Sequence, residues 1–395
     1  TRYLGTMEDT VDHNYHWHDA IHAISPLHMD SIVAPENNPC GLDVREPCDD
    51  NGHGTHTMGT MVGRSGMDTI GVAPGARWIA CRNMERGYGS PASYIECFEW
   101  FLAPTDLDGN KPDPARAPHV INNSWSCPPM EGCHPGNFEL IRAAIGNLRA
   151  AGIVVVTSAG NAGPDCNTIN RPPGMFAESF VVGATNINDT IADFSSRGAV
   201  QVDSSGRIKP DVVAPGVGVR SAWLDSNYIF ANGTSMAGPH VAGTVALIIS
   251  ANPDLAGQVG VIEDIIRSTA IPLVTTQVCD SLSDQDVPNN TYGYGRINAL
   301  AAVRKALTLS SVRQPPAVEQ LQVFPNPARD DISVRTTSGK PCSGLSLVSI
   351  TGQVIRVIPK SACADFVSIA ELPPGMYFLT GEHAGRAFSA RFVKM

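Results

Sequence analysis

Residues 232–243 read Asn-Gly-Thr-Ser-Met-Ala-Gly-Pro-His-Val-Ala-Gly, and this stretch decides the fold of the chain. Gly233 allows a turn, and Pro239 is tolerated only near the start of a helix. Residues 241–248 continue as an apolar helix, and the small residues beside them permit close packing. Ser235 therefore begins a buried helix, where a serine is either a helix cap or a nucleophile that a base activates.

Two further stretches supply the polar groups that such a nucleophile needs. Residues 51–63 begin Asn-Gly-His-Gly-Thr-His, and the imidazole of His53 has the near-neutral pKa of a general base. Residues 153–164 open with an apolar β-branched run that predicts a buried strand, which leads Asn161 into a Gly-flanked loop. An amide held there can donate to the oxyanion that forms on an attacked carbonyl.

These stretches resemble the subtilases, the subtilisin-type serine peptidases. The matches that carry the resemblance are HGTH at 53–56, SAGN at 158–161 and GTSMAGPHVAG at 233–243. Supporting matches are VINNSW at 120–125, KPDVVAPG at 209–216 and YGYGRINALAAV at 292–303. The resemblance implies an α/β fold, in which helices cover both faces of a subtilisin-like parallel sheet.

The resemblance also implies roles for individual residues. His53 is then the general base and Ser235 the nucleophile, while Asn161 and the Ser235 backbone amide form the oxyanion hole. The second histidines of the two motifs, His56 and His240, are expected to be structural. The strand before Ser124, Trp125 and Ser126 is expected to pair with the substrate backbone beside Gly160, although Trp125 as core filler is equally consistent with the sequence.

The aspartate of the family's Asp, His, Ser order is not identifiable. No aspartate before His53 follows an apolar strand or precedes Thr-Gly or Ser-Gly; those present are Asp9, Asp12, Asp19, Asp30, Asp43, Asp49 and Asp50. The opening stretch instead resembles the segment that follows this aspartate in bacillopeptidase-like subtilases. We therefore expect the catalytic aspartate and its strand upstream of Thr1, which leaves two inner strand edges of the sheet exposed.

Two alternatives stay open for the missing acid. Asp9 or Asp12 could substitute for it from a loop. The chain could instead be a pseudoprotease, a surface protein that keeps the groove to bind peptides without cutting them.

The remaining pattern predicts alternating strands and helices. A helix is expected from Phe138 to Leu148, ended by Gly152, and is followed directly by a strand at 153–157. Further strands are expected at 177–185 and 211–214, and 103–118 reads as a loop. This alternation is typical of a parallel sheet covered on both faces.

Composition agrees with a secreted hydrolase of two domains. The 395 residues include 37 glycines and 30 prolines, and only 17% are charged, which is a loop-rich globular profile. The net charge of −10 and the lack of any Lys- or Arg-rich run argue against nucleic acid as a partner. No apolar stretch reaches the roughly 20 residues that span a bilayer. We expect a monomer that acts on proteins or peptides.

Cysteine usage indicates an oxidising compartment. The ten cysteines form an even set without metal-type spacing, which favours disulfides. Sequence proximity suggests three local pairs: Cys40 with Cys48, Cys127 with Cys133, and Cys342 with Cys363.

No metal or cofactor is required for the expected chemistry, and no metal ligands are assigned. Structural calcium is compatible with the oxygen-rich segment 106–113, but its spacing does not make an EF-hand loop, and an acidic turn is the preferred interpretation. The histidines at 13, 16, 18 and 22 lack a satisfying ligand pattern, and surface and packing roles are preferred for them.

The end of the chain changes character. We expect a peptidase domain over 1–306, a polar linker over 307–320 and a small β-sandwich over 321–395. The last of these resembles the C-terminal sorting domain of the type IX secretion system of Bacteroidetes-type bacteria, through FPNPARD at 324–330, TGQ at 351–353, LPPGMYFL at 372–379 and the terminal FVKM. A generic carbohydrate- or protein-binding module is the alternative.

As a sorting domain, the tail implies recognition by the secretion machinery and a final place outside the cell or on its surface. Taken together, the sequence predicts a secreted serine endopeptidase that hydrolyses peptide bonds through an acyl-enzyme intermediate.

Overall fold

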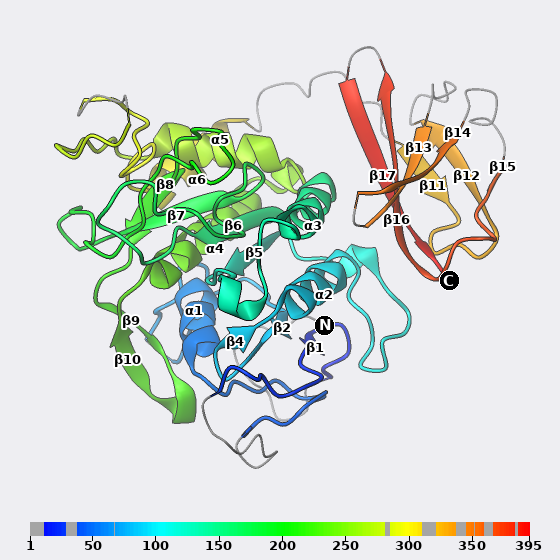
Figure 1. Ribbon diagram of the computed structural model, residues 1–395, viewed down its shortest axis with the longest axis horizontal. Helices are drawn as coiled ribbons and strands as arrows, with labels where there is room; N and C mark the ends of the chain where they lie inside the picture. The colour runs from blue at the N-terminus through cyan, green and yellow to red at the C-terminus, as the bar shows by residue number, and fades with distance from the viewer. Residues whose placement is uncertain are drawn as a thin grey trace. The chain divides into compact units, whose positions relative to one another are not determined.

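The computed structural model describes residues 12–28, 38–66, 68–280, 285–309, 321–336, 345–350, 352–358, 366–383 and 386–395. The chain divides into two compact units, residues 1–311 and 312–395, which are described separately. The first unit is an α/β structure and the second is built from antiparallel strands (Figure 1).

A four-stranded parallel sheet forms the centre of the first unit. Its order is β5 (Val120–Asn123), β6 (Val154–Ser158), β7 (Phe180–Thr185) and β8 (Val212–Pro215). Every residue of β6 and β7 is buried, as expected for apolar strands that are covered on both faces. The strands predicted at 153–157, 177–185 and 211–214 are confirmed, each with shifted ends.

Helices cover both faces of this sheet. Helix α4 (Thr234–Ala251) contacts all four strands, and α5 (Val259–Thr269) and α6 (Ala299–Leu309) extend the same apolar cluster. Val154 and Val156 face this cluster, so Val155 between them faces the opposite layer, where α3 (Phe138–Ala150) contacts β6. Helix α2 (Pro91–Leu102) packs beside α3.

Helix α4 is also long and apolar enough to cross a membrane by length and composition alone, and it is the one such helix among the described residues. Its 18 residues are 61% buried inside the protein, where they contact the sheet. It is therefore the core helix of the first unit.

Helix α3 ends where the sequence predicts. The amide of Gly152 donates to the carbonyl of Arg149 at 2.9 Å, and the next amide, of Ile153, donates to Leu148 at 3.0 Å. The chain then enters β6 at Val154 without a longer loop, as the βαβ rhythm requires.

Short strands surround the sheet. Strand β1 (Trp17–Asp19) pairs in parallel with β2 (Ala80–Arg82), and β9 (Val219–Ala222) forms an antiparallel hairpin with β10 (Tyr228–Ala231) that leads into α4. The remaining short elements of this unit are β3 (Met84–Glu85), β4 (Tyr88–Gly89) and single 3₁₀ turns at Pro114–Arg116, Pro129–Glu131, Leu224–Ser226 and Pro253–Leu255.

Four disulfides join the described cysteines. Cys40–Cys48 and Cys127–Cys133 confirm two of the local pairs predicted from the sequence. Cys81–Cys97 joins β2 to α2, and Cys166–Cys279 bridges 113 residues of sequence. The predicted pair Cys342–Cys363 lies outside the described residues.

The second unit consists of two antiparallel sheets. One has the order β14 (Val354–Ile358), β13 (Leu345–Ser349), β16 (Gly375–His383) and β17 (Arg386–Lys394). The other has the order β11 (Leu321–Phe324), β12 (Asp331–Thr336) and β15 (Phe366–Ser368). Their shared apolar core includes Ile332, Val334, Leu345, Leu347, Leu379 and Phe392.

The FPNPARD motif closes one edge of this second unit. Asn326 donates from Nδ2 to the carbonyl of Arg391 at 3.1 Å and accepts the amide of Val393 at 2.9 Å. The amide of Ala328 donates to the carbonyl of Val393 at 2.8 Å. These bonds satisfy peptide groups on the edge of β17 that pairs with no described strand, which protects that edge.

The residue that precedes helix α1 (His53–Val62), Gly52, has no side chain to cap the helix. Asp49, three residues before Gly52, caps the helix instead. Its Oδ1 accepts the amides of Asn51 and Gly52 at 2.9 and 2.7 Å, and its Oδ2 accepts the amide and hydroxyl of Thr55 at 2.8 and 2.7 Å. One carboxylate therefore satisfies three amides of the turn and first helical residues, and it lies at the positive end of the helix dipole.

Replacing Asp49 by alanine is expected to destabilise the first unit by about 1–2 kcal/mol at pH 7. Burial opposes ionisation of Asp49, but the hydrogen bonds from Thr55, Asn51 and Gly52 prevail and lower its pKa. Its contribution is therefore present above about pH 4, the ordinary aspartate pKa, and is lost as the pH falls through the lowered folded-state pKa.

Urea unfolding of the Asp49→Ala variant and the parent at pH 7 and at pH 3 measures this. The exposed Asp254→Ala change is the control. A destabilisation of Asp49→Ala that is equal at both pH values contradicts the role given to the carboxylate.

Candidate active site

Ser235 lies in the first turn of α4, directly after the turn that Gly233 makes. Gly233 has a φ of +153°, at the edge of the region that favours glycine. The hydroxyl of Ser235 donates to the carbonyl of Ser124 at 3.2 Å, at the end of β5. The predicted nucleophile is thus at a helix N-terminus beside the edge strand of the sheet.

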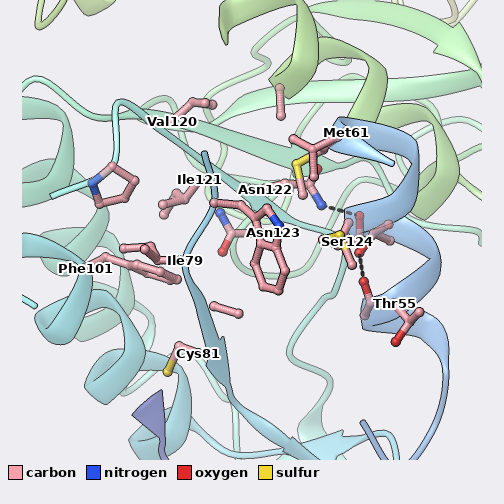
Figure 2. Close-up of a pocket in the computed structure, with 18 of the residues that line it drawn as sticks. Thr55, Met61, Ile79, Cys81, Phe101, Val120, Ile121, Asn122, Asn123 and Ser124 are labelled. Carbon is pink, nitrogen blue, oxygen red and sulfur yellow. Dashed lines mark hydrogen bonds between the residues drawn. The ribbon is translucent and has the colours of Figure 1, made fainter. Parts of the chain in front are cut away.

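Ser124 makes a second hydrogen bond to Ser235, and Pro239 explains why. Proline has no amide hydrogen, so the carbonyl of Ser235, four residues earlier, loses its helical partner. The hydroxyl of Ser124 donates to that carbonyl at 2.8 Å. Asn122 in turn donates from Nδ2 to the Ser124 hydroxyl at 2.9 Å (Figure 2). A chain of side-chain bonds from β5 therefore fixes the start of α4.

Asn161 is held beside Ser235 by Thr234. The Asn161 Oδ1 accepts both the amide and the hydroxyl of Thr234 at 2.9 Å, and the Thr234 hydroxyl accepts the amide of Gly160 at 3.1 Å. With Oδ1 engaged, Nδ2 is the donor that faces the turn, 3.5 Å from where a Cβ on Gly233 would stand. Sequence reasoning missed Thr234, although it is the residue directly before Ser235 in the motif.

His53 is the first residue of α1. Burial lowers its pKa, the negative charge of Asp49 raises it, and His56 lowers it further; the net shift is downward. Among the described residues, no hydrogen bond joins the His53 ring to Ser235 or to a carboxylate. The structure therefore brings Ser235 and Asn161 together through Thr234, and it does not link His53 to either of them directly.

None of the described aspartates before His53 orients its ring. All of the bonds recorded for Asp49 go to the turn and helix amides and to Thr55. Asp19 and Asp50 are both buried against the guanidinium of Arg82. Asp12 is bonded to Asn14. Asp43 binds His22 instead. The alternative at Asp9, like Asp30, lies outside the described residues.

A cavity of about 1,140 Å³ opens beside His53. Its walls come from β2, β5, α1 and α2, and Figure 2 shows Ile79 and Cys81 on one side, Val120–Ser124 across the middle, and Met61 of α1 beyond Asn122 and Ser124. Most of the lining is apolar, and two buried polar atoms that face no partner, Arg82 Nε and Asn122 Oδ1, belong to lining residues.

Two strand edges border this cavity. Among the described strands, β2 pairs with β1 alone and β5 pairs with β6 alone. The Ala80 amide and the Arg82 carbonyl bond toward β1, so the peptide group of Cys81 between them points the other way. The carbonyl of His119 accepts from β6, so the peptide groups of Val120 and Asn122 point away from β6. The peptide groups of Cys81, Val120 and Asn122 therefore pair with no described strand, and the missing inner strand expected from the sequence stays a prediction.

The residues expected at the substrate strand have mixed surroundings. Trp125 stacks on Tyr94 with ring centroids 3.8 Å apart and planes 6° apart, and it also contacts Phe98. It is half-buried, so packing accounts for one face of its ring. Ser126 follows it before the Cys127–Cys133 disulfide.

The second histidines of the motifs have backbone partners. His56 is buried and its Nε2 lies 3.1 Å from the carbonyl of Val219, while His240 Nδ1 lies 2.9 Å from the carbonyl of Met236. Burial lowers the pKa of both rings.

The described residues contain no group of three or more His, Cys, Asp or Glu side chains arranged to hold a metal ion. Asp106 accepts the amides of Asp108 and Asn110, the pattern of a closed acidic turn. Of the N-terminal histidines, His18 and His22 share the carboxylate of Glu96.

Comparison with known proteins matches both units. Residues 16–295 fit the subtilase family and residues 322–395 fit the secretion system C-terminal sorting domain. Bacillopeptidase F of Bacillus subtilis (strain 168) is 41% identical over 311 residues, which is 76% of this chain and 20% of that protein. Serine protease AprX of the same organism is 34% identical over 64% of this chain and 58% of its own length. Subtilisin Savinase of Lederbergia lenta is 34% identical over 65% of this chain and 79% of its own length.

The chain thus spans about a fifth of the first of these relatives and somewhat more than half of the second. Its C-terminal unit points to a secreted or cell-surface protein. The subtilase match covers well over half of the chain and coincides with the parallel sheet, α1, α4 and the loop of Asn161. The chain therefore belongs to the subtilase family and ends in a secretion sorting domain.

Proposed function

We propose that the first unit is a serine endopeptidase that hydrolyses peptide bonds through an acyl-enzyme intermediate. The observation that carries this is the Thr234 bridge, which holds Asn161 by its Oδ1 at the residue directly before Ser235, at the start of α4. Relatives named as proteases favour an enzyme over the peptide-binding alternative.

In this mechanism Ser235 attacks the scissile carbonyl carbon while His53 removes the hydroxyl proton. The oxyanion that forms accepts hydrogen bonds from Asn161 Nδ2 and from the Ser235 amide. Protonated His53 then gives its proton to the leaving amine as the C–N bond breaks. Water attacks the resulting ester with His53 again as base, which releases the acid and restores Ser235.

The low pKa of His53 suits this role. A base must be unprotonated at the working pH, and burial keeps the ring neutral to a lower pH than an exposed histidine. The imidazolium that forms during attack is correspondingly costly unless a carboxylate stabilises it. The site therefore needs an acid that the described residues do not present to His53.

The cavity between β2 and β5 is where we place this acid. An extended apolar segment lying there can bond with the peptide groups of Cys81, Val120 and Asn122, which reach no described strand. An aspartate at the end of that segment nearest His53 then orients the ring. We propose that this is the segment expected upstream of Thr1.

Substrate and delivery follow from the two units. We propose that an extended protein or peptide substrate runs beside Ser124–Ser126 and Gly160, with the free face of Trp125 against one of its side chains. The sorting unit, residues 321–395, is proposed to be the part that a type IX secretion machinery recognises.

The nucleophile is tested on the protein expressed from a reading frame extended upstream of Thr1, beside its Ser235→Ala variant. We expect the parent to cleave casein and to react with a fluorophosphonate probe, and the variant to do neither, because the alanine has no hydroxyl to form the acyl-enzyme. Peptide mapping of the labelled parent is expected to find the adduct on Ser235. A stably folded parent that is inert in both assays contradicts the enzyme and supports the peptide-binding alternative.

The oxyanion donor is tested by Asn161→Ala in the same active protein. We expect kcat to fall roughly 10²- to 10³-fold, the known cost of removing one such donor from a subtilisin, while KM changes far less. Asn188→Ala, on an exposed turn, is the matched control. An equal loss in both variants, or an effect confined to KM, argues against oxyanion donation by Asn161.

A further inference from the structure

Trp223 follows β9 and lies against the residue that precedes His53. A Cβ built on Gly52 would stand 2.6 Å from two atoms of the Trp223 indole and 2.9 Å from a third. The ring therefore rests on the bare backbone of Gly52. Gly52 also has a φ of +86°, so glycine is favoured there both by conformation and by this close approach.

The hairpin that carries Trp223 is also bound to α1 at His56. The Nε2 of His56 lies 3.1 Å from the Val219 carbonyl, and the Ser221 hydroxyl donates to the His56 carbonyl at 2.8 Å. The Trp223 ring meets the His56 ring edge to face, with centroids 6.2 Å apart. At the N-terminal end of α1, Trp223 of this interface contacts Gly52, the residue directly before His53.

The same hairpin also leads into the nucleophile turn. Asn232 accepts the amide of Gly218 at 2.6 Å through Oδ1, and the amide of Gly233 donates to the Gly216 carbonyl at 2.8 Å. The hairpin is therefore tied at its base to the turn before Ser235, and through Trp223 to the turn before His53. The hairpin thus connects the segments that carry Ser235 and His53, the two residues of the proposed dyad.

We propose that Trp223 is a positioning residue for His53: by packing on Gly52 it sets where the first turn of α1 stands relative to Ser235. This rests on the proposed function, in which His53 is the base. Asp49 fixes the backbone of the same turn from within, but it bonds only to amides and to Thr55 and leaves the placement of the turn to packing. Trp223 is half-buried, and its closest approach is to a residue without a side chain.

The first test compares Trp223→Ala, Trp223→Phe and Ser221→Ala in the active, frame-extended protein. Ser221→Ala removes a buried hydrogen bond from the same interface without touching Gly52, so it controls for general loosening. We expect Trp223→Ala to lower kcat roughly 10- to 100-fold with little change in KM, because small misplacements of a catalytic group are that costly. Trp223→Phe is expected to lie between it and the parent.

The pH profile separates positioning from a merely structural role. Asp49 and His56 are the titratable groups whose charges act on His53. Burial is the largest cause of the low pKa of His53, and the indole packs on the residue directly before it. We therefore expect that removing the indole opens this turn to water and moves the acid limb of kcat/KM upward, toward the ordinary histidine value of about 6.5. Ser221→Ala is expected to leave this limb in place. Identical acid limbs in Trp223→Ala and the parent overturn the proposal.

A second test uses Gly52→Ala in both backgrounds. With Trp223 present, the new methyl group collides with the indole; with Trp223→Ala, only the φ strain is left. We therefore expect Gly52→Ala to lower both kcat and the unfolding midpoint less in the Trp223→Ala background. Equal effects in the two backgrounds contradict the contact on which the proposal depends. Coupled midpoints in a protein that neither cleaves casein nor reacts with the probe show instead that the contact is real and the proposed function wrong.

Discussion

The packing of α4 against the parallel sheet is the interaction on which the rest of this structure depends. The helix contacts all four strands, and its first turn carries Ser235. Pro239 removes one helical hydrogen bond near that turn, and Ser124 of the strand end replaces it. Thr234 uses its amide and hydroxyl to hold Asn161. The start of this core helix therefore determines the positions of the proposed nucleophile and the proposed oxyanion donor.

The proposed base is governed by a different constraint. His53 belongs to α1, whose start is fixed by the Asp49 cap within the turn and by Trp223 from the hairpin. Neither contact bonds to the imidazole ring. Burial favours the neutral ring, so a neighbouring carboxylate is needed to stabilise the charge that proton transfer creates. In the proposed function such a group is brought in between β2 and β5, whose edges facing the cavity pair with no described strand.

The sequence alone predicts the structural features that depend on a local pattern of residues. Each of these features is specified by residues that are close together in the sequence. They are the apolar run of β6, the helical spacing of α3 and the disulfides Cys40–Cys48 and Cys127–Cys133. Thr234, Trp223 and the disulfides Cys81–Cys97 and Cys166–Cys279 were not predicted, because each acts on a partner that the fold, rather than the sequence spacing, brings close. The role of Asp49 was hidden by its distance from the helix it caps.

We propose that a strand lying between β2 and β5 completes the catalytic site. Amide hydrogen exchange, measured on the 395-residue chain and on the frame-extended protein, tests whether this strand is present. We predict that the segments around Cys81 and around Val120–Asn122 exchange markedly more slowly in the extended protein, while the interior of β7, paired on both sides in either form, exchanges equally in both. Equal exchange at Cys81 and Val120–Asn122 in the two proteins would contradict the claim, because a strand in the cavity necessarily pairs with these edges.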